Sequence, residues 1–247
     1  MNDWLSKLLT AREEGICLTL PERALPGAGR ALALSPHPDD PDAVAVTLRM
    51  LKQGGWNLHW VILTSGWSGV QNTLVGSGRS AKQQLREAEQ GESARLFGLP
   101  AGCLTFLRLE ENERGELAPT AENRHRLFCN LEELAPDIVL LPHAEDTNAT
   151  HRLTYQWFAE WAGQGQRPLI ALGNEDPKTR AFRPDMQVVF GETSAAWKAS
   201  LLECHRSQSL RNQAIRGITF AQRILGINRC ATDEYAERFQ VAVWRKD

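Results

Sequence analysis

The chain has 247 residues, with 28 Lys and Arg, 30 Asp and Glu, and a formal net charge of −2. This length suits one large α/β domain or two small ones, and a hydrophobic fraction of 42% is ordinary for a soluble globular protein. The near-neutral charge argues against a nucleic-acid-binding protein, which would carry excess basic residues for phosphate contacts. It also argues against a protein that binds anionic membrane surfaces.

Membrane-spanning and secreted proteins are excluded by the same inspection. No apolar run approaches the roughly 20 residues that cross a bilayer. The N-terminal segment carries Asp3 and lacks both the apolar stretch and the cleavage site of a secretory signal. The five cysteines are an odd number, widely spread and without a C-x-x-C pair, which supports neither a disulfide framework nor a cysteine-based zinc site. We therefore expect reduced thiols in a cytoplasmic protein.

Short apolar runs alternate with helical patterns along the chain. Strands are predicted at 31–35, 59–64, 104–107, 138–141, 169–172, 187–190 and 239–244. Helices are predicted at 42–53, 80–97, 121–134, 153–162 and 193–207. Because apolar strands alternate with helices, the pattern predicts an α/β fold with a mostly parallel sheet and helices on both faces.

Polar loops directly follow three of the predicted strands, at 36–40, 65–67 and 142–151. In open parallel sheets, ligands bind beyond the carboxyl ends of the strands. These loops would therefore share one edge of the sheet, and two of them carry possible metal ligands.

The first loop places His37, Asp39 and Asp40 on a turn stiffened by two prolines. Adjacent side chains in such a turn point in different directions, so one aspartate would bind a metal while the other faces substrate. The second polar loop offers His143, Asp146, Asn148 and His151. Two histidines and one carboxylate with an open position are the ligands of a hydrolytic zinc site, where the metal lowers the pKa of bound water to about 7. The alternative for the first loop alone is a turn with an aspartate that caps a helix.

Several segments, in order, resemble the LmbE/PIG-L-like, zinc-dependent N-deacetylases. They are L-S-P-H-P-D-D at 34–40, L-T-S-G at 63–66, R-E-A at 86–88, S-A at 93–94, L-F-G at 96–98, N-A-T-H-R at 148–152, Lys198 with H-R-S-Q at 205–208, and A-E-R-F at 236–239. The resemblance implies a Rossmann-like fold in a single domain over residues 1–247. It implies hydrolysis of an N-acetyl group of an amino sugar or a related small-molecule conjugate, with metal-bound water as the nucleophile. Its implied zinc ligands are His37, Asp40 and His151, and its implied general base is Asp39.

The chain departs from the family pattern at two positions. Pro41 stands where the family has Glu, and Asn148 replaces a histidine that stabilises the oxyanion. Asn148 can still donate a neutral hydrogen bond. We therefore expect it to donate to the substrate carbonyl, the alternative being that it only caps the helix near His151. We also expect Arg86 to contact the substrate, the alternative being an ordinary salt-bridged helix face.

Four further features carry expectations of their own. His143 either supports the site or fixes a strand end, and His205 is expected to fix the C-terminal helix rather than act in chemistry. Trp67 either stacks on a sugar ring or packs in the core. The four glycines of 66–78 predict a mobile loop over the site.

The leading hypothesis is thus a metal-dependent N-deacetylase that binds one zinc ion and a small N-acetylated substrate. The alternative is a metal- or sugar-binding protein of the same fold with weakened catalysis, which Pro41 and Asn148 motivate, although such a protein would not need Asp39. A nucleotide-binding protein is disfavoured because the first loop is acidic and lacks G-x-G-x-x-G. The sequence leaves the oligomeric state open, a homo-oligomer included.

Overall fold

A computed structural model gives the structure of residues 3–165, 167–232 and 234–244. The strands are β1 (Leu18–Pro21), β2 (Arg30–Ser35), β3 (Asn57–Ile62), β4 (Leu104–Phe106), β5 (Ile138–Pro142), β6 (Leu169–Asn174), β7 (Met186–Phe190) and β8 (Tyr235–Trp244). The α-helices are α1 (Asp3–Glu13), α2 (Ala45–Gln53), α3 (Asn72–Val75), α4 (Arg79–Phe97), α5 (Ala121–Leu134), α6 (Ala149–Gln164), α7 (Glu192–Glu203), α8 (Arg206–Arg216) and α9 (Phe220–Asn228). Two short 3-10 helices are η1 (Asp40–Val44) and η2 (Trp67–Gly69).

Within the described residues, the strands form an eight-stranded sheet in the order β1-β7-β8-β6-β5-β2-β3-β4. Neighbouring strands are parallel except at β8, which is antiparallel to β6 and β7. The predicted mostly parallel α/β sheet is therefore confirmed. From β2 the chain first builds β3 and β4 on one side and later β5 and β6 on the other. The order of building reverses between β2 and β5, and open α/β sheets bind ligands at such a point.

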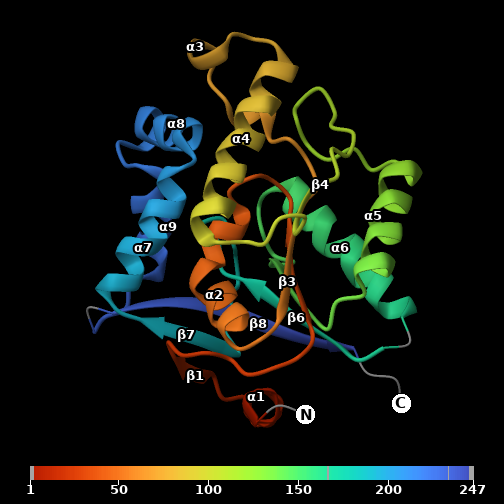
Figure 1. Ribbon diagram of the computed structural model, residues 1–247, viewed down its shortest axis with the longest axis vertical. Helices are drawn as coiled ribbons and strands as arrows, with labels where there is room; N and C mark the ends of the chain where they lie inside the picture. Colours follow the sequence, from red (N-terminus) through yellow and green to blue (C-terminus); the bar gives the residue numbers. More distant parts are fainter. Residues whose placement is uncertain (1–2, 166, 233, 245–247) are drawn as a thin grey trace.

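Helices cover both faces of the sheet, as the alternating pattern predicts. One face packs against α1, α2, α4 and α7, and the other against α5 and α6. Figure 1 shows α5 and α6 on the right, α7, α8 and α9 on the left, and α2 and α4 between them. Along β2, Ala31 and Ala33 face the first layer, whereas Leu32 and Leu34 face the second. Both faces of this strand are buried, which is why its sequence is continuously apolar.

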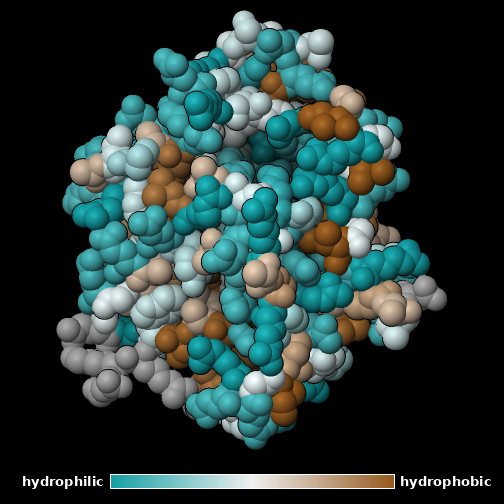
Figure 2. Space-filling view, turned by 180° about the vertical axis from the view of Figure 1, so that it is seen from behind, coloured by the Kyte–Doolittle hydropathy of each residue, from teal (hydrophilic) through white to brown (hydrophobic). Residues whose placement is uncertain are grey.

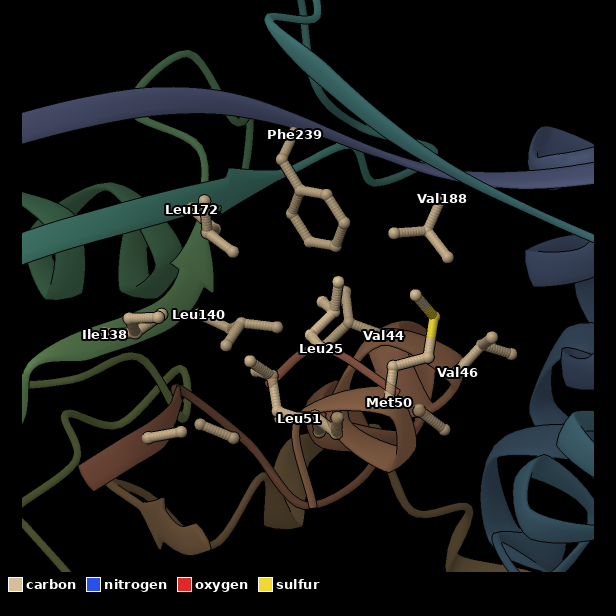
Figure 3. Close-up of a cluster of buried hydrophobic side chains, with 14 of the residues drawn as sticks. Leu25, Val44, Val46, Met50, Leu51, Ile138, Leu140, Leu172, Val188 and Phe239 are labelled. Carbon is tan, nitrogen blue, oxygen red and sulfur yellow. The ribbon is translucent and has the colours of Figure 1, made fainter. Parts of the chain in front are cut away.

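The larger apolar core lies between α2 and the sheet (Figure 3). Val46, Met50 and Leu51 of α2 are completely buried, with Leu140 of β5 and Phe239 of β8 in the same cluster. Burying a side chain of this kind stabilises the fold by about 1.5–3 kcal/mol. The packing fixes α2, and with it η1, the 3-10 turn that directly precedes α2 and begins at Asp40.

The end of α2 requires a glycine. A Cβ on Gly54 would lie 1.8 Å from the carbonyl oxygen of Leu25, so no other residue fits without movement of the backbone. The helix accordingly ends where the sequence predicted, at the Gly54-Gly55 pair. Outside the cores, the face in Figure 2 is dominated by hydrophilic side chains, and its hydrophobic residues form small, separate patches.

The expected elements are present, with three corrections. The predicted helix 193–207 is two helices, because the chain turns at Cys204 and His205 and begins again as α8. The predicted helix 153–162 begins earlier, at Ala149, so that His151 lies in its first turn. The expected loop 66–78 contains η2 and α3. The sequence analysis also missed β1 and the helices α1, α8 and α9. Among the described residues, no helix combines the length and hydropathy that a transmembrane segment needs.

Candidate metal centre

The two polar loops with possible metal ligands meet at the carboxyl ends of β2 and β5. These strands are paired neighbours in the sheet, so the residues that follow them emerge side by side. His37 and Asp40 come from the loop after β2, and His151 comes from the first turn of α6. One ligand atom from each of the three lies within 4.8 Å of the others. The structure thus brings together the three side chains that the family resemblance implies as zinc ligands.

The distances within this triad leave room for one ion. His151 Nε2 lies 3.2 Å from His37 Nδ1 and 3.7 Å from Asp40 Oδ1. His37 Nδ1 lies 3.5 Å from Asp40 Oδ2. Zinc is a borderline-soft ion that binds both imidazole nitrogen and carboxylate oxygen, and three protein ligands leave a fourth position open. The donor set therefore fits a catalytic zinc ion or a similar divalent metal.

Each ligand is held by the protein behind it. His151 Nδ1 lies 2.9 Å from Asp146 Oδ2, and the backbone N–H of His37 donates to Asp40 Oδ2 over 2.7 Å. Burial opposes protonation of His151, but the carboxylates of Asp40 and Asp146 outweigh burial and raise its pKa above the ordinary value. Burial likewise works against ionisation of Asp40, but His151 and His37 hold its pKa well below its usual range. The site therefore favours a charged carboxylate beside two imidazoles.

Asp39 lies in the same cavity but is held by a different element, α4. Its backbone adopts a left-handed conformation with φ of 103°, which is unfavourable for a residue other than glycine. Two α4 side chains stabilise this conformation. The Asp39 N–H donates to Gln90 Oε1 over 2.8 Å, and Arg86 Nη2 donates to Asp39 Oδ1 over 2.8 Å. Such strain persists only where the surroundings enforce it, and it is common at functional sites.

Arg86 is buried, with 2% of its surface exposed, and it also donates to the Pro38 carbonyl oxygen. Its Nε and Nη1 atoms have no hydrogen-bond partner among the described residues. Nη1 lies 3.8 Å from Glu89 Oε2. The structure therefore gives Arg86 a clear role in holding Asp39. That Arg86 contacts substrate stays a prediction.

A buried polar network lies beneath Asp39, and the sequence analysis missed it. Asp42 accepts hydrogen bonds from Ser93 Oγ at 2.7 Å and from Gln90 Nε2 at 3.4 Å, and its Oδ2 lies 2.6 Å from His205 Nε2. The α4 members of this region are spaced by one helical turn, which places them on one face. This spacing of polar residues along a charged helix is the feature of the sequence that could have predicted a buried polar face on α4.

Lys198 and Glu237, from the C-terminal segments that resemble the family, support the start of α2. Glu237 accepts the backbone N–H groups of Val46 and Thr47 at 3.0 and 2.8 Å, as a carboxylate at a helix N-terminus does. Lys198 Nζ donates to Glu237 at 2.7 Å and to the Ala43 carbonyl at 2.6 Å. This buried ion pair fixes the turn that carries Asp40.

Asn148 is the N-cap of α6, and its Oδ1 accepts the backbone N–H of Thr150 at 2.9 Å. Its side-chain nitrogen Nδ2 makes no hydrogen bond to another described residue, and Asn148 lines the same cavity as the triad. The capping role is therefore present in the structure. The expected contact of its N–H with substrate is compatible with that role, because capping uses only the oxygen.

The cavity has a volume of about 430 Å³, within the range of small-molecule sites.

His143 does not line this cavity. Its Nε2 contacts Gln240 Oε1 and its Nδ1 accepts the Glu145 N–H at 3.1 Å, so it fixes the end of β5. Trp67 is also outside the lining, and the Arg79 guanidinium lies 4.5 Å from its ring centroid. Gly66 and Gly69 of the predicted glycine-rich loop do line the cavity.

Comparison with known proteins identifies the family. The model of the PIG-L family, described as GlcNAc-PI de-N-acetylase, matches residues 32–162. A comparison with curated proteins found no match.

Solved structures with low sequence identity share the fold. The N,N'-diacetylchitobiose deacetylase from Pyrococcus horikoshii has a TM-score of 0.69 and 20% identity, covering 87% of this chain and 84% of that one. The zinc-inhibited form of teicoplanin deacetylase has a TM-score of 0.64 and 14% identity, with coverages of 88% and 100%. GalB, the 4-carboxy-2-hydroxymuconate hydratase from Pseudomonas putida, has a TM-score of 0.61 and 20% identity, with coverages of 88% and 98%.

Proposed function

Since the chain belongs to the PIG-L family, we propose that it hydrolyses the N-acetyl group of an amino sugar or a related small-molecule conjugate, using one divalent metal ion, zinc. The observation that carries this proposal is the triad of His37, Asp40 and His151 with Asp39 in the same cavity. A metal site without a neighbouring base would suit binding alone. The two acetyl-removing structural neighbours support the choice of reaction.

The triad would hold the metal through His37 Nδ1, an Asp40 oxygen and His151 Nε2. When bound, zinc supplies a positive charge that polarises an amide carbonyl and makes a water molecule more acidic. Asp146 keeps His151 in the tautomer with Nε2 free for the metal, because it accepts the Nδ1 proton. The teicoplanin enzyme has a zinc-inhibited form, so metal should be added to this protein in equimolar amount.

Asp39 is the proposed general base. Its Oδ1 is occupied by Arg86, so Oδ2 is the oxygen that would accept the proton of the attacking water. The same oxygen would then carry that proton to the departing amine. A base held in place on both its backbone and its side chain loses little free energy to reorganisation during the reaction.

Asn148 is the proposed donor to the carbonyl oxygen of the substrate. Capping α6 through Oδ1 fixes the orientation of its amide group, which leaves the N–H₂ for another acceptor. An amide donor is neutral and does not titrate, unlike the histidine of the family pattern. The proposed assistance is therefore weaker than that of a charged imidazole and independent of pH.

The test is metal analysis followed by acetate release from a panel of N-acetylated amino sugars. We expect about one zinc per chain and acetate release that is lost on chelation and restored by one equivalent of zinc. A protein that binds zinc but releases no acetate from any compound would support the alternative of a binding protein with weakened catalysis. A protein without bound metal would contradict the assignment of the triad.

A further inference from the structure

The cavity of the metal centre is unusually basic for this chain. Its described lining contains seven Arg and Lys residues against four Asp and Glu residues, although the whole chain has a net charge of −2. The basic residues are Arg86, Arg114, Arg152, Lys178, Arg211, Arg216 and Arg223. Arg86 holds Asp39, but metal binding and acetyl hydrolysis do not need the other six positive charges, so these call for a separate explanation.

Three of these arginines form what we call the cationic wall: Arg211 and Arg216 on α8, and Arg223 on α9. The two helices pack against each other and lie on one side of α4 (Figure 1). No hydrogen bond or ion pair joins the three side chains to any other described residue. Some arginines elsewhere are paired, as Arg108 is with Glu87 at 2.8 Å and Arg238 with Glu175 at 3.1 Å. Others, such as Arg23, Arg95 and Arg206, are unpaired within the described part of the chain but do not line the cavity, so the wall differs from them in having three unpaired arginines around one cavity.

Burial and neighbouring positive charges both act against the charged state of Arg211 and Arg223. Partial desolvation lowers the pKa of Arg211, and the positive charges of Arg216 and Arg86 lower it further. Desolvation also lowers the pKa of Arg223, and Arg216 and Arg211 add to the decrease, although the carboxylates of Asp176 and Asp39 oppose it. An anion bound between these guanidinium groups would offset their mutual repulsion and stabilise their charged state.

Hydrogen bonds to α4 and to Gly69 fix the position of α8, which carries two of the three wall arginines. Ser207 donates its N–H and its Oγ to Glu89 of α4 at 2.7 and 2.6 Å, which anchors the first turn of α8. Gln208 donates to the carbonyl oxygen of Gly69 at 3.3 Å. A Cβ on Gly69 would lie 3.5 Å from Arg211 Nη1, so this guanidinium packs against the segment 66–69. At the other end of that segment, Gly66 lies beside Arg86 and His37.

We propose that Arg211, Arg216 and Arg223 bind an anionic group of the substrate, a phosphate or a carboxylate, while the N-acetyl group lies at His37, Asp40 and His151. The proposal rests on the proposed hydrolytic function for the other end of the substrate. Guanidinium groups bind phosphate and carboxylate oxygens through paired hydrogen bonds, and such charge-assisted bonds are stronger than neutral ones. The preferred substrate is thus an N-acetylated amino sugar that carries an acidic substituent.

Binding of a simple anion tests the wall without any catalysis. Inorganic phosphate and malonate are titrated into the as-purified protein by calorimetry, and thermal unfolding is followed, at constant ionic strength. We expect saturable binding that raises the melting temperature, and the tighter of the two anions identifies the substituent. Arg211→Gln, Arg216→Gln and Arg223→Gln should each weaken binding by about tenfold or more.

Two variants serve as controls. Arg206→Gln removes the same charge from the exposed first residue of α8, outside the cavity lining, and should bind as wild type does. His151→Ala should also retain anion binding. The proposal would be overturned if Arg206→Gln weakened binding as much as the wall variants do, or if no saturable binding were seen. It would also be overturned if only His151→Ala lost binding, because the anion would then occupy the metal centre.

A kinetic comparison separates this proposal from the hydrolytic function. Acetate release is measured with N-acetylglucosamine 6-phosphate and with N-acetylglucosamine. We expect a higher kcat/KM for the phosphorylated sugar, and loss of only this preference in Arg216→Gln. Equal kcat/KM values in wild type and variant would overturn the anion site and leave hydrolysis standing. Saturable phosphate binding that needs the arginines, with no acetate release from any compound, would overturn hydrolysis and leave the anion site standing.

Discussion

The two ends of the cavity are built in opposite ways. At the metal centre, the polar side chains have partners in the protein: Asp146 holds His151, and Gln90 and Arg86 hold Asp39. At the cationic wall, the side chains of Arg211 and Arg216 have none among the described residues. Both ends share one cavity and are joined by α4, which contacts Asp39 on one side and α8 on the other.

The difference matches the roles that we propose for the two ends. Groups that carry out chemistry must be placed before the substrate arrives, so their hydrogen bonds are satisfied within the protein. Groups that recognise a substituent gain most when the ligand supplies their missing partner. We therefore expect substitutions at the metal centre to affect turnover for every substrate, and substitutions at the wall to affect only anionic ones.

The largest effect is expected for His151→Ala. Loss of one of three ligands should remove most of the metal and abolish acetate release. Metal content by elemental analysis checks this, with His59→Ala as the control, since His59 lies in β3 and contacts Thr105 instead. Full metal content in His151→Ala would show that the ion binds elsewhere.

Asp39→Asn should keep the metal and lower kcat by about 100-fold or more, because the amide cannot accept the proton. The shape of the side chain and its acceptor oxygen for Arg86 are retained. Single-turnover acetate release and metal analysis on the same sample check both parts. Near wild-type turnover would rule out Asp39 as the base.

Two variants of Asn148 separate its capping role from its proposed catalytic role. Asn148→Ala removes both groups, so it should lower the unfolding free energy by about 1 kcal/mol and kcat by about 100-fold. Asn148→Asp keeps the capping oxygen but loses the N–H donor. We expect it to retain stability and still lose kcat, together with kcat/KM, as a transition-state interaction would. Lost stability with intact turnover in Asn148→Ala would reduce Asn148 to a helix cap.

Asp146→Asn tests whether the support behind His151 matters. The carboxylate that accepts the Nδ1 proton becomes an amide, which should weaken metal affinity by about 10–100-fold. Competition with a chelator of known affinity measures the change. Once saturated with metal, the variant should recover most of its turnover, and failure to recover would indicate that Asp146 acts beyond positioning the ligand.

The smallest effect is expected at the wall. Arg216→Gln should leave the unfolding free energy unchanged or raise it by a few tenths of a kcal/mol, because it removes repulsion and no bond. Chemical denaturation without added anion measures this. A loss of more than about 1 kcal/mol would mean that Arg216 is structural, and the contrast between the two ends would fail.

The proximity of His37, Asp40 and His151 could be predicted from the sequence better than that of the three arginines, for physical reasons. His37 and Asp40 lie on one short loop after a strand, so their proximity is local, and the parallel sheet brings His151 to the same edge. The contacts that hold Asp39 are not local. Gln90 is 51 residues away in the chain, and although the polar residues of α4 share one face, their spacing does not reveal which loop that face will meet.

The C-terminal helices show the same limit. The segment 193–207 has no glycine or proline, so its pattern predicts one helix, yet the chain turns at His205. The turn places this imidazole 2.6 Å from Asp42, 163 residues away, which is a tertiary contact. Arginines on a polar helix such as α8 are ordinarily solvated, so the wall becomes visible only once the cavity is known.

Anomalous diffraction at the zinc absorption edge, from crystals grown with one equivalent of zinc, tests the central claim most directly. The account predicts one strong peak in contact with His37, Asp40 and His151, beside Asp39 and away from the three arginines. The absence of a peak at this position, or a peak bound by other residues, would contradict the assignment of the metal centre and the division of the cavity that follows from it.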